Sequence, residues 1–329
     1  MRADAFLTGG SGIVGGHLLA ALIGGGVAVR ALARSEAAAG AVSDHGAVPV
    51  FGDLFDADAL AEGMSGVDVI YHVAGVNESC SRDPRAMDRV NIDGTVAVIR
   101  AAAATGVRRV VYTSSAAAIG EREGTIGVEE TVHSGEYLSA YARSKYLAEM
   151  VATEEASRLG VDLVVVSPSS VQGPGRATGS AELLLRALNS KRPLLVDVML
   201  SIVDIEDCTT GHINAARYGS VGERYILSGA TLSVAEVVDL LATVTGREIH
   251  PRWVSESLVR RLGIPAARIA AVVKPSLGVC PDLIRTLLHG HRFDGSKAAK
   301  ELRFTYREPS DTISRTVQWF AEKGLVRGD

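Results

Sequence analysis

A glycine-rich turn near the start of the chain restricts its fold more than any other feature. Ala3 to Thr8 is a short apolar run, Gly9-Gly10-Ser11-Gly12-Ile13-Val14-Gly15 follows it, and His17 to Ile23 continues with helical periodicity. This order, strand then glycine turn then helix, opens a βαβ unit. The first glycine of the G-x-x-G-x-x-G spacing permits a sharp turn, the second a close approach to pyrophosphate, and the third tight helix packing. The free N–H groups of the helix then suit a phosphate, so the turn predicts a dinucleotide site.

The rest of the first half continues this pattern. Helical stretches at Arg85 to Thr105 and Tyr141 to Leu159 alternate with apolar runs that we interpret as strands. These runs are Val27 to Ala33, Val48 to Phe51, Val67 to Val73, Arg109 to Ser114 and Asp162 to Ser167. Nearly continuous Val, Ile and Leu strands between helices are typical of a parallel sheet covered on both faces. The prediction is a Rossmann-type α/β fold, a doubly wound parallel sheet.

Beyond Pro168 the pattern becomes irregular. Pro174, Gly175 and Gly179 indicate a loop, and the following helices and short strands no longer repeat the βαβ order. We therefore predict an NAD(P)-binding domain over residues 1–168 and a smaller mixed α/β substrate-binding portion over 169–329, some of whose strands return to the main sheet.

Composition and charge exclude several classes of protein. The 34 Lys and Arg residues against 38 Asp and Glu residues give a net charge of −4, without the basic field that nucleic acid requires. Ala5 to Val29 lacks charged residues, but Asp4 and the many glycines argue against a signal peptide or membrane span. Cys80, Cys208 and Cys280 lie far apart without CxxC spacing, which predicts reduced thiols and a cytoplasmic protein.

The end of the second predicted strand indicates which coenzyme is bound. An acidic residue there would hydrogen-bond the free ribose hydroxyl of NAD, whereas a cation would accept the 2′-phosphate of NADP. The strand ends in Ala33-Arg34-Ser35 without an acid. We expect Arg34 to prefer NADP(H), with NAD(H) possible; the alternative is an ordinary solvated arginine.

A tyrosine and a lysine form the candidate catalytic pair. Tyr141 and Lys145 lie one helical turn apart on one face, and a lysine at that distance lowers the pKa of a tyrosine toward acid/base use. Thr113-Ser114-Ser115 ends a predicted strand, at the sheet edge where such folds bind ligands. Ser115 is therefore expected to hydrogen-bond a substrate oxygen while Tyr141 exchanges its proton.

Together these motifs resemble the extended short-chain dehydrogenase/reductases, the NAD(P)-dependent epimerase/dehydratase superfamily. Thr8 to Gly15 is similar to its TGxxGxxG turn, and Tyr141 with Lys145 to its YxxxK pair. The other matching segments are Gly52-Asp53-Leu54, His72-Val73-Ala74-Gly75, Asn91 to Thr95, Tyr112-Thr113-Ser114-Ser115-Ala116, and Ser167-Pro168 through Val171-Gln172 to Pro174.

The resemblance implies a role for each segment. It implies hydride transfer with Tyr141 as acid/base, Lys145 on the nicotinamide ribose and Ser115 polarising a carbonyl. Further coenzyme contacts would come from residues that follow the strands: Asp53, Leu54, Val73, Ala74, Gly75, Thr113, Pro168 and Val171. It also implies a homodimer in which the two long helices of each protomer form a four-helix bundle.

The sequence differs from some subgroups of this superfamily at positions that bear on their chemistry, and this limits the activities to be expected. Ala116-Ala117 stands where sugar-nucleotide dehydratases carry Asp-Glu, and Leu200 stands about where epimerases carry an arginine that grips pyrophosphate. Arg30, Arg34 and Pro168 resemble the dihydroflavonol-reductase-like carbonyl reductases. We therefore expect an NADP(H)-dependent ketone/alcohol oxidoreductase, with a sugar-nucleotide epimerase or a non-catalytic dinucleotide sensor as alternatives.

Substrate contacts are expected from loops over the strand ends. Asn77, Glu78, Ala116 and Gln172 are the candidates for a small-molecule carbonyl or alcohol. His133, His289 and His291 have no metal-ligand spacing, so the sequence predicts no metal site.

Overall fold

The centre of the molecule is a seven-stranded parallel sheet. The computed structural model describes residues 4–274 and 278–326. The strands lie in the order β10-β6-β5-β4-β1-β2-β3, and every neighbouring pair is parallel. Their bounds are β1 (Ala5–Thr8), β2 (Val29–Ala33), β3 (Val48–Phe51), β4 (Val69–His72), β5 (Arg109–Thr113), β6 (Asp162–Pro168) and β10 (Arg224–Leu227). The predicted Rossmann-type fold is confirmed.

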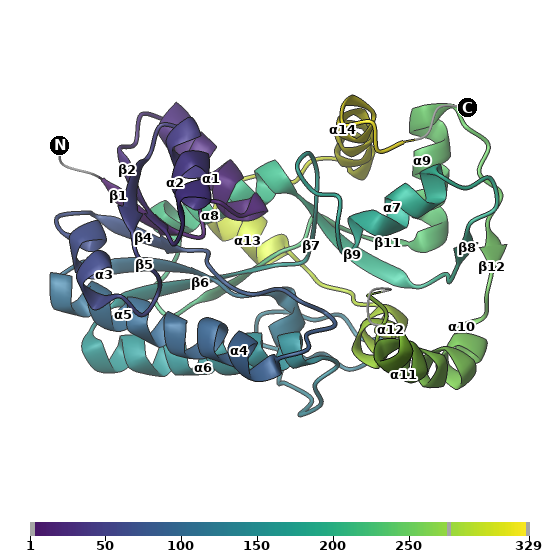
Figure 1. The fold of residues 1–329 in the computed structure, drawn as a ribbon, viewed down its shortest axis with the longest axis horizontal. Helices are drawn as coiled ribbons and strands as arrows, with labels where there is room; N and C mark the ends of the chain where they lie inside the picture. The colour runs from purple at the N-terminus through teal and green to yellow at the C-terminus, as the bar shows by residue number, and fades with distance from the viewer. Residues whose placement is uncertain (1–3, 275–277, 327–329) are drawn as a thin grey trace.

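Helices cover both faces of this sheet, as Figure 1 shows. One face packs against α1 (Ile13–Gly24), α2 (Glu36–Asp44), α8 (Ile205–Tyr218) and α13 (Ser296–Glu301). The other packs against α3 (Ala57–Met64), α5 (Gly94–Thr105) and α6 (Ala140–Leu159). Phe6 and Leu7 of β1, on opposite faces, are both fully buried. Burial on two sides explains why the strands are apolar almost throughout.

The long helix expected over Arg85 to Thr105 has three parts. It consists of α4 (Pro84–Asp88), a π-helical turn η1 (Arg89–Asp93) and α5. The side chain of Asp83 caps α4 by accepting from the backbone N–H groups of Arg85 and Ala86. Since π-turns inside helices frequently lie at functional sites, η1 draws attention to its buried residue, Asn91.

The second half of the chain forms a smaller layer beyond the carboxyl ends of the strands (Figure 1). A mixed sheet β11-β9-β7 and a two-stranded sheet β12-β8 lie among the remaining helices. The strands are β7 (Ser170–Gln172), β8 (Leu194–Leu195), β9 (Met199–Asp204), β11 (Ala230–Ser233) and β12 (Arg252–Trp253). The helices are α7 (Ala181–Leu188), α9 (Val234–Thr245), α10 (Glu256–Leu258), α11 (Ile264–Val273), α12 (Pro281–His289) and α14 (Pro309–Glu322), with a π-helical turn η3 (Val259–Gly263).

The chain crosses between the two parts more than once. After β9, α8 packs on the main sheet, and β10 then pairs with β6 at the sheet edge. The residues around α12 return to contact the loop that follows β5, where the backbone of Gly127 bridges that of Phe293. Sequence-distant segments therefore meet above the carboxyl edge of the sheet. No helix among the described residues is long and apolar enough to cross a membrane.

The expectation of three reduced cysteines is wrong for two of them. Cys80, on the loop after β4, and Cys280, the residue before α12, form a disulfide across a sequence separation of 200 residues. Only the tertiary fold brings the two together, which is why their spacing gave no signal. Cys208 is a free, buried thiol whose pKa is raised by burial. Cysteine spacing therefore no longer supports a cytoplasmic location.

Candidate active site

The glycine turn is a backbone cradle with no room for side chains. Gly9 adopts a φ of +81°, and a Cβ there would lie 2.6 Å from the backbone nitrogen of Ala74. A Cβ on Gly15 would lie 2.1 Å from the carbonyl oxygen of Gly9. Gly12 caps α1 without any side-chain hydrogen bond, so the first N–H groups of the helix receive no side-chain acceptor at the cap. This arrangement fits the pyrophosphate of a dinucleotide, with Ser11, Ile13 and Val14 on the same turn.

The predicted adenosine contacts lie at the ends of β2 and β3. Arg34 is exposed directly after β2. Asp53 is also exposed, and its carboxylate accepts a hydrogen bond from the backbone N–H of Phe55 at 2.7 Å. Leu54 is buried against Gly94, where a Cβ would lie 2.7 Å from Leu54 Cδ1. An exposed cation next to the glycine turn is compatible with a ribose phosphate.

A buried hydrogen-bond chain fixes the end of β4. His72 Nδ1 lies 2.8 Å from Thr8 Oγ1, and its Nε2 lies 3.0 Å from Thr95 Oγ1. Burial, aided by the charge of Lys145, lowers the pKa of His72 to about 3, so the ring is neutral. Thr8 Oγ1 also accepts from the backbone N–H of Ala74 at 3.3 Å. The chain therefore ties the glycine turn to the segment Val73-Ala74-Gly75.

Asn91 links the following loop to the catalytic helix. Its side-chain oxygen accepts from the N–H of Val76 at 2.7 Å, and its amide nitrogen donates to the carbonyl of Val76 at 3.0 Å and to Ser144 Oγ at 2.9 Å. Ser144 in turn donates to the carbonyl of Tyr141 at 2.8 Å. The π-turn places this amide between the loop after β4 and the first turn of α6, which orients both Tyr141 and Lys145.

Tyr141 and Ser115 meet at the carboxyl edge of the sheet. Ser115 follows β5 and caps the short 3-10 helix η2 (Ala116–Ala118), accepting from the N–H of Ala117 at 3.2 Å. Burial raises the pKa of Tyr141 above its ordinary value, and a hydrogen bond with Ser115 and the charge of Arg176 offset only part of this rise. The lowering of this pKa that was expected from Lys145 is therefore not seen, and the cation that acts on the phenol is Arg176. The two hydroxyl groups therefore lie within hydrogen-bonding reach of each other.

Lys145 is buried beside the coenzyme segment after β4. Its Nζ donates to the carbonyl oxygen of Thr113 at 2.9 Å, and a Cβ on Gly75 would lie 3.2 Å from the same Nζ. Burial lowers the pKa of Lys145 to about 8, and the negative charge of Glu149 opposes this shift. Gly75 therefore leaves free the space beside the ammonium group that a Cβ would crowd.

Glu149 is a further residue of the site, beyond those predicted from the sequence. It is 5% exposed, one turn after Lys145 on the same helix face. Its Oε2 accepts from Ser114 Oγ at 2.5 Å, and its Oε1 pairs with Arg224 of β10. The four-residue spacing Tyr141, Lys145, Glu149 was visible in the sequence. Its partner Arg224 was not, because β10 joins β6 only in the folded chain.

The remaining predicted contact residues lie at the ends of β5 and β6 and in β7. Pro168 ends β6 and Val171 is part of the core beneath the site. Thr113 Oγ1 lies 2.9 Å from His212 Nε2, which anchors the strand end to α8. Gln172 is buried and donates to Ser170 Oγ at 3.1 Å and Ser180 Oγ at 2.6 Å, which leaves its oxygen unpaired among the described residues.

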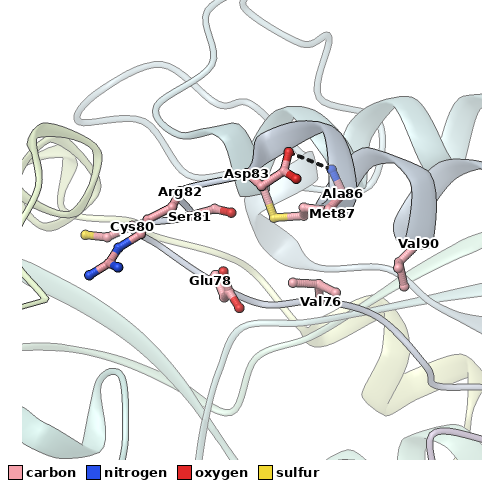
Figure 2. A pocket seen from close by; sticks show the side chains of 9 residues that line it. All are labelled: Val76, Glu78, Cys80, Ser81, Arg82, Asp83, Ala86, Met87 and Val90. Carbon is pink, nitrogen blue, oxygen red and sulfur yellow. Dashed lines mark hydrogen bonds between the residues drawn. The ribbon is translucent and has the colours of Figure 1, made fainter. Parts of the chain in front are cut away.

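A cavity of about 490 Å³ adjoins the loop after β4. Figure 2 shows it between that loop and α4, with Glu78, Arg82 and Met87 among its lining side chains. Asn77 is exposed on the same loop and Ala116 is buried under the site. Ser115, Tyr141 and Lys145 do not line this cavity, so we place the chemistry at the strand ends and regard the cavity as a neighbouring recess.

Comparisons with known proteins agree with this geometry. The model of the NAD dependent epimerase/dehydratase family matches residues 5–227. The "Putative dihydroflavonol 4-reductase" of Synechocystis sp. is 32% identical over 98% of this chain and 96% of its own length. The 4-hydroxy-2-methyl-3-oxo-4-farnesyl-3,4-dihydroquinoline-1-oxide ketoreductase of Stigmatella aurantiaca is 32% identical over 83% of this chain and 80% of its own.

A solved structure extends the match to the whole fold. The crystal structure of gox2253 superposes with a TM-score of 0.85 at 27% identity, covering 99% of this chain and all of the other. The family match covers more than half of the chain, including the glycine turn and the Tyr141–Lys145 pair. The chain therefore belongs to the NAD-dependent epimerase/dehydratase family, and is an NAD(P)-dependent oxidoreductase of the extended short-chain dehydrogenase/reductase type.

Proposed function

We propose that the protein is an NADP(H)-dependent oxidoreductase that interconverts a ketone and a secondary alcohol. The observation that carries this proposal is the convergence of Ser115, Tyr141 and Lys145 beside a glycine cradle. Relatives named as reductases support it. The bound coenzyme supplies or accepts the hydride at its nicotinamide ring.

The side chains of the site have separate roles in this reaction. Ser115 and Tyr141 donate hydrogen bonds to the substrate oxygen as negative charge develops there, and Tyr141 then delivers its proton. In the oxidation direction Tyr141 accepts that proton. Lys145 holds a ribose hydroxyl and carries positive charge close to the site. Asn91 and Glu149 act through these residues, because they fix α6 and the ammonium group.

The position of one arginine favours an anionic substrate. Arg176 is partly buried and its charge reaches Tyr141, whereas Arg224 is paired with Glu149. We therefore favour Arg176 as the replacement for the pyrophosphate-gripping residue missing at Leu200, over the other candidates Arg186, Arg192 and Arg224. The same cation would serve a sugar-nucleotide epimerase, which stays the alternative function.

Arg34 provides the test of coenzyme preference. If it meets the 2′-phosphate, Arg34→Ala should raise KM for NADPH by about tenfold or more, since a charged hydrogen bond is worth roughly 1.5–3 kcal/mol. KM for NADH should change less than twofold. Arg30→Ala is the matched control, because Arg30 donates to the carbonyl of Glu62 at 2.9 Å. Equal use of both coenzymes by the unaltered enzyme would rule the preference out.

Glu149 should control the alkaline side of the pH profile. Burial lowers the pKa of Lys145 to about 8, and the negative charge of Glu149 opposes this lowering. In Glu149→Gln this support is lost, so Lys145 loses its proton at lower pH and the alkaline fall of kcat/KM moves to lower pH. The exposed Glu154→Gln on the same helix is the control. An alkaline limb at the same pH in both variants would argue against a role for the Lys145 charge.

We also propose that the protein is a homodimer formed through α5 and α6. Met150 of α6 is 54% exposed, which is a large apolar surface for one helix position.

The remaining alternative function is a dinucleotide sensor. Such a protein would bind NADPH without transferring hydride to any carbonyl compound, and Tyr141→Phe would leave its NADPH affinity unchanged.

A further inference from the structure

Three potential metal ligands from distant parts of the chain meet beside α12. Glu121 lies on the loop after η2, His289 is the last residue of α12, and His291 follows two residues later. Glu121 Oε1 lies 2.6 Å from His291 Nδ1 and 3.3 Å from His289 Nε2. The three ligand atoms lie within 4.8 Å of one another. This convergence is independent of Ser115, Tyr141 and Lys145.

The buried carboxylate of Glu121 is paired through only one of its two oxygens among the described residues. The residue is 3% exposed, and both histidines approach the same oxygen, Oε1. Its other oxygen, Oε2, is buried without a hydrogen-bond partner among the described residues. An unpaired buried carboxylate oxygen is costly, so a further group at this point would stabilise the fold. A cation is the partner that an anionic oxygen favours most.

The ligand types and spacing suit zinc. Two imidazoles and one carboxylate are a common catalytic zinc set, with bonds of about 2.0–2.2 Å. Tetrahedral ligand atoms at such bond lengths lie roughly 3.3–3.5 Å apart, and the Glu121–His289 distance of 3.3 Å already matches. The Glu121–His291 distance of 2.6 Å would have to lengthen, and the His291 side chain, 19% exposed, has room to move.

The backbone around the cluster is fixed by other contacts. Gly127 donates to the carbonyl of Arg292 at 2.8 Å, and Asp294 donates to the carbonyl of Gly127 at 3.0 Å. Phe293 donates to Ser201 Oγ at 2.9 Å, and its ring stacks on His291 at 5.4 Å between centroids. The segments that carry the ligands are therefore held in register before any metal binds.

We propose that Glu121, His289 and His291 bind a divalent transition metal of the zinc type. The sequence predicted no metal, because His289 and His291 alone lack a ligand spacing; the third ligand lies 168 residues away and is supplied by the fold. The metal clamps the carboxyl end of α12 to the loop after β5, while the Cys80–Cys280 disulfide holds the other end of the helix. Three protein ligands leave one coordination position for water.

Metal titration of the full chain, without a histidine tag and after chelator treatment, tests this site. Zn²⁺ binding is measured by elemental analysis and calorimetry, and Co²⁺ by its visible absorption, which is strong only at low coordination number. His291→Gln and His289→Gln remove one ligand each. The control is His250→Gln, because His250 lies 3.4 Å from Glu248 on the surface, with side chains 70% and 89% exposed.

The expected result is one Zn²⁺ per chain, an intense Co²⁺ spectrum, and affinity at least about tenfold lower in both ligand variants but unchanged in His250→Gln. Zn²⁺ should also raise the Tm of the unaltered chain and not that of His291→Gln, whose metal-free Tm reports whether it folds. Failure of the chelator-treated chain to bind one equivalent, or Zn²⁺ affinity in His289→Gln and His291→Gln equal to that of the unaltered chain, would overturn the proposal.

Discussion

Replacing Tyr141 by phenylalanine is expected to lower kcat/KM by about 10²–10⁴, the usual contribution of a positioned general acid. The change removes only the hydroxyl that hydrogen-bonds Ser115 and that Arg176 acts on. The ring stays, so the packing of α6 and the coenzyme cradle should persist. NADPH affinity should therefore change less than about threefold, and the loss should appear in kcat.

Tyr146→Phe is the matched control for this variant. Tyr146 lies on the same helix, but its ring packs at a tilt against His133, with 4.1 Å between centroids. Steady-state rates and NADPH binding are measured for both variants. Turnover of Tyr141→Phe within threefold of the unaltered enzyme would mean that another group delivers the proton.

Gly15→Ala should nearly abolish coenzyme binding. Its Cβ would lie 2.1 Å from the oxygen and 2.7 Å from the carbon of the Gly9 carbonyl, and both are backbone atoms. The turn must open to admit the methyl group, which moves the N–H groups at the start of α1. Overpacking of this kind costs roughly 1–3 kcal/mol of unfolding free energy. NADPH affinity is expected to fall by about a hundredfold or more.

The neighbouring glycine supplies the control. A Cβ on Gly16 would meet the oxygen of Gly10 at 3.5 Å, an ordinary contact. Because Gly16 lies inside α1, Gly16→Ala should leave the free energy of unfolding unchanged or raise it by about 0.4–1 kcal/mol. Urea unfolding and NADPH fluorescence titration measure both effects. Comparable NADPH affinity in the two variants would show that the close approach of Gly15 to Gly9 is not required.

The fold could be predicted because its signals are local. The central parallel strands are buried on both faces, so an apolar run such as Asp162 to Ser167 marks its strand directly; the observed β6 ends at Pro168. Ser233 and Glu236 form the capping box that opens α9, and both are close in sequence. The glycine spacing and the YxxxK pair are likewise short patterns.

Features that join distant segments could not be predicted. The Cys80–Cys280 disulfide and the approach of Arg176 to Tyr141 depend on how the second half packs over the first, and the Asn91 contact with Ser144 joins two helices that are 53 residues apart in the sequence. Sequence spacing carries no information about such encounters. The resemblance includes Asn91 in a motif, but its role as a link between the loop after β4 and α6 follows only from its hydrogen bonds.

Transfer of deuterium from the coenzyme tests the proposed function most directly. NADPH labelled with deuterium at nicotinamide C4 is incubated with the enzyme and a panel of ketones. The masses of the products are then measured by mass spectrometry. The proposal predicts a secondary alcohol carrying one deuterium, with one NADPH consumed per product and no transfer by Tyr141→Phe. Tight NADPH binding without any labelled alcohol, or turnover of a sugar nucleotide with no net NADPH consumption, would contradict it.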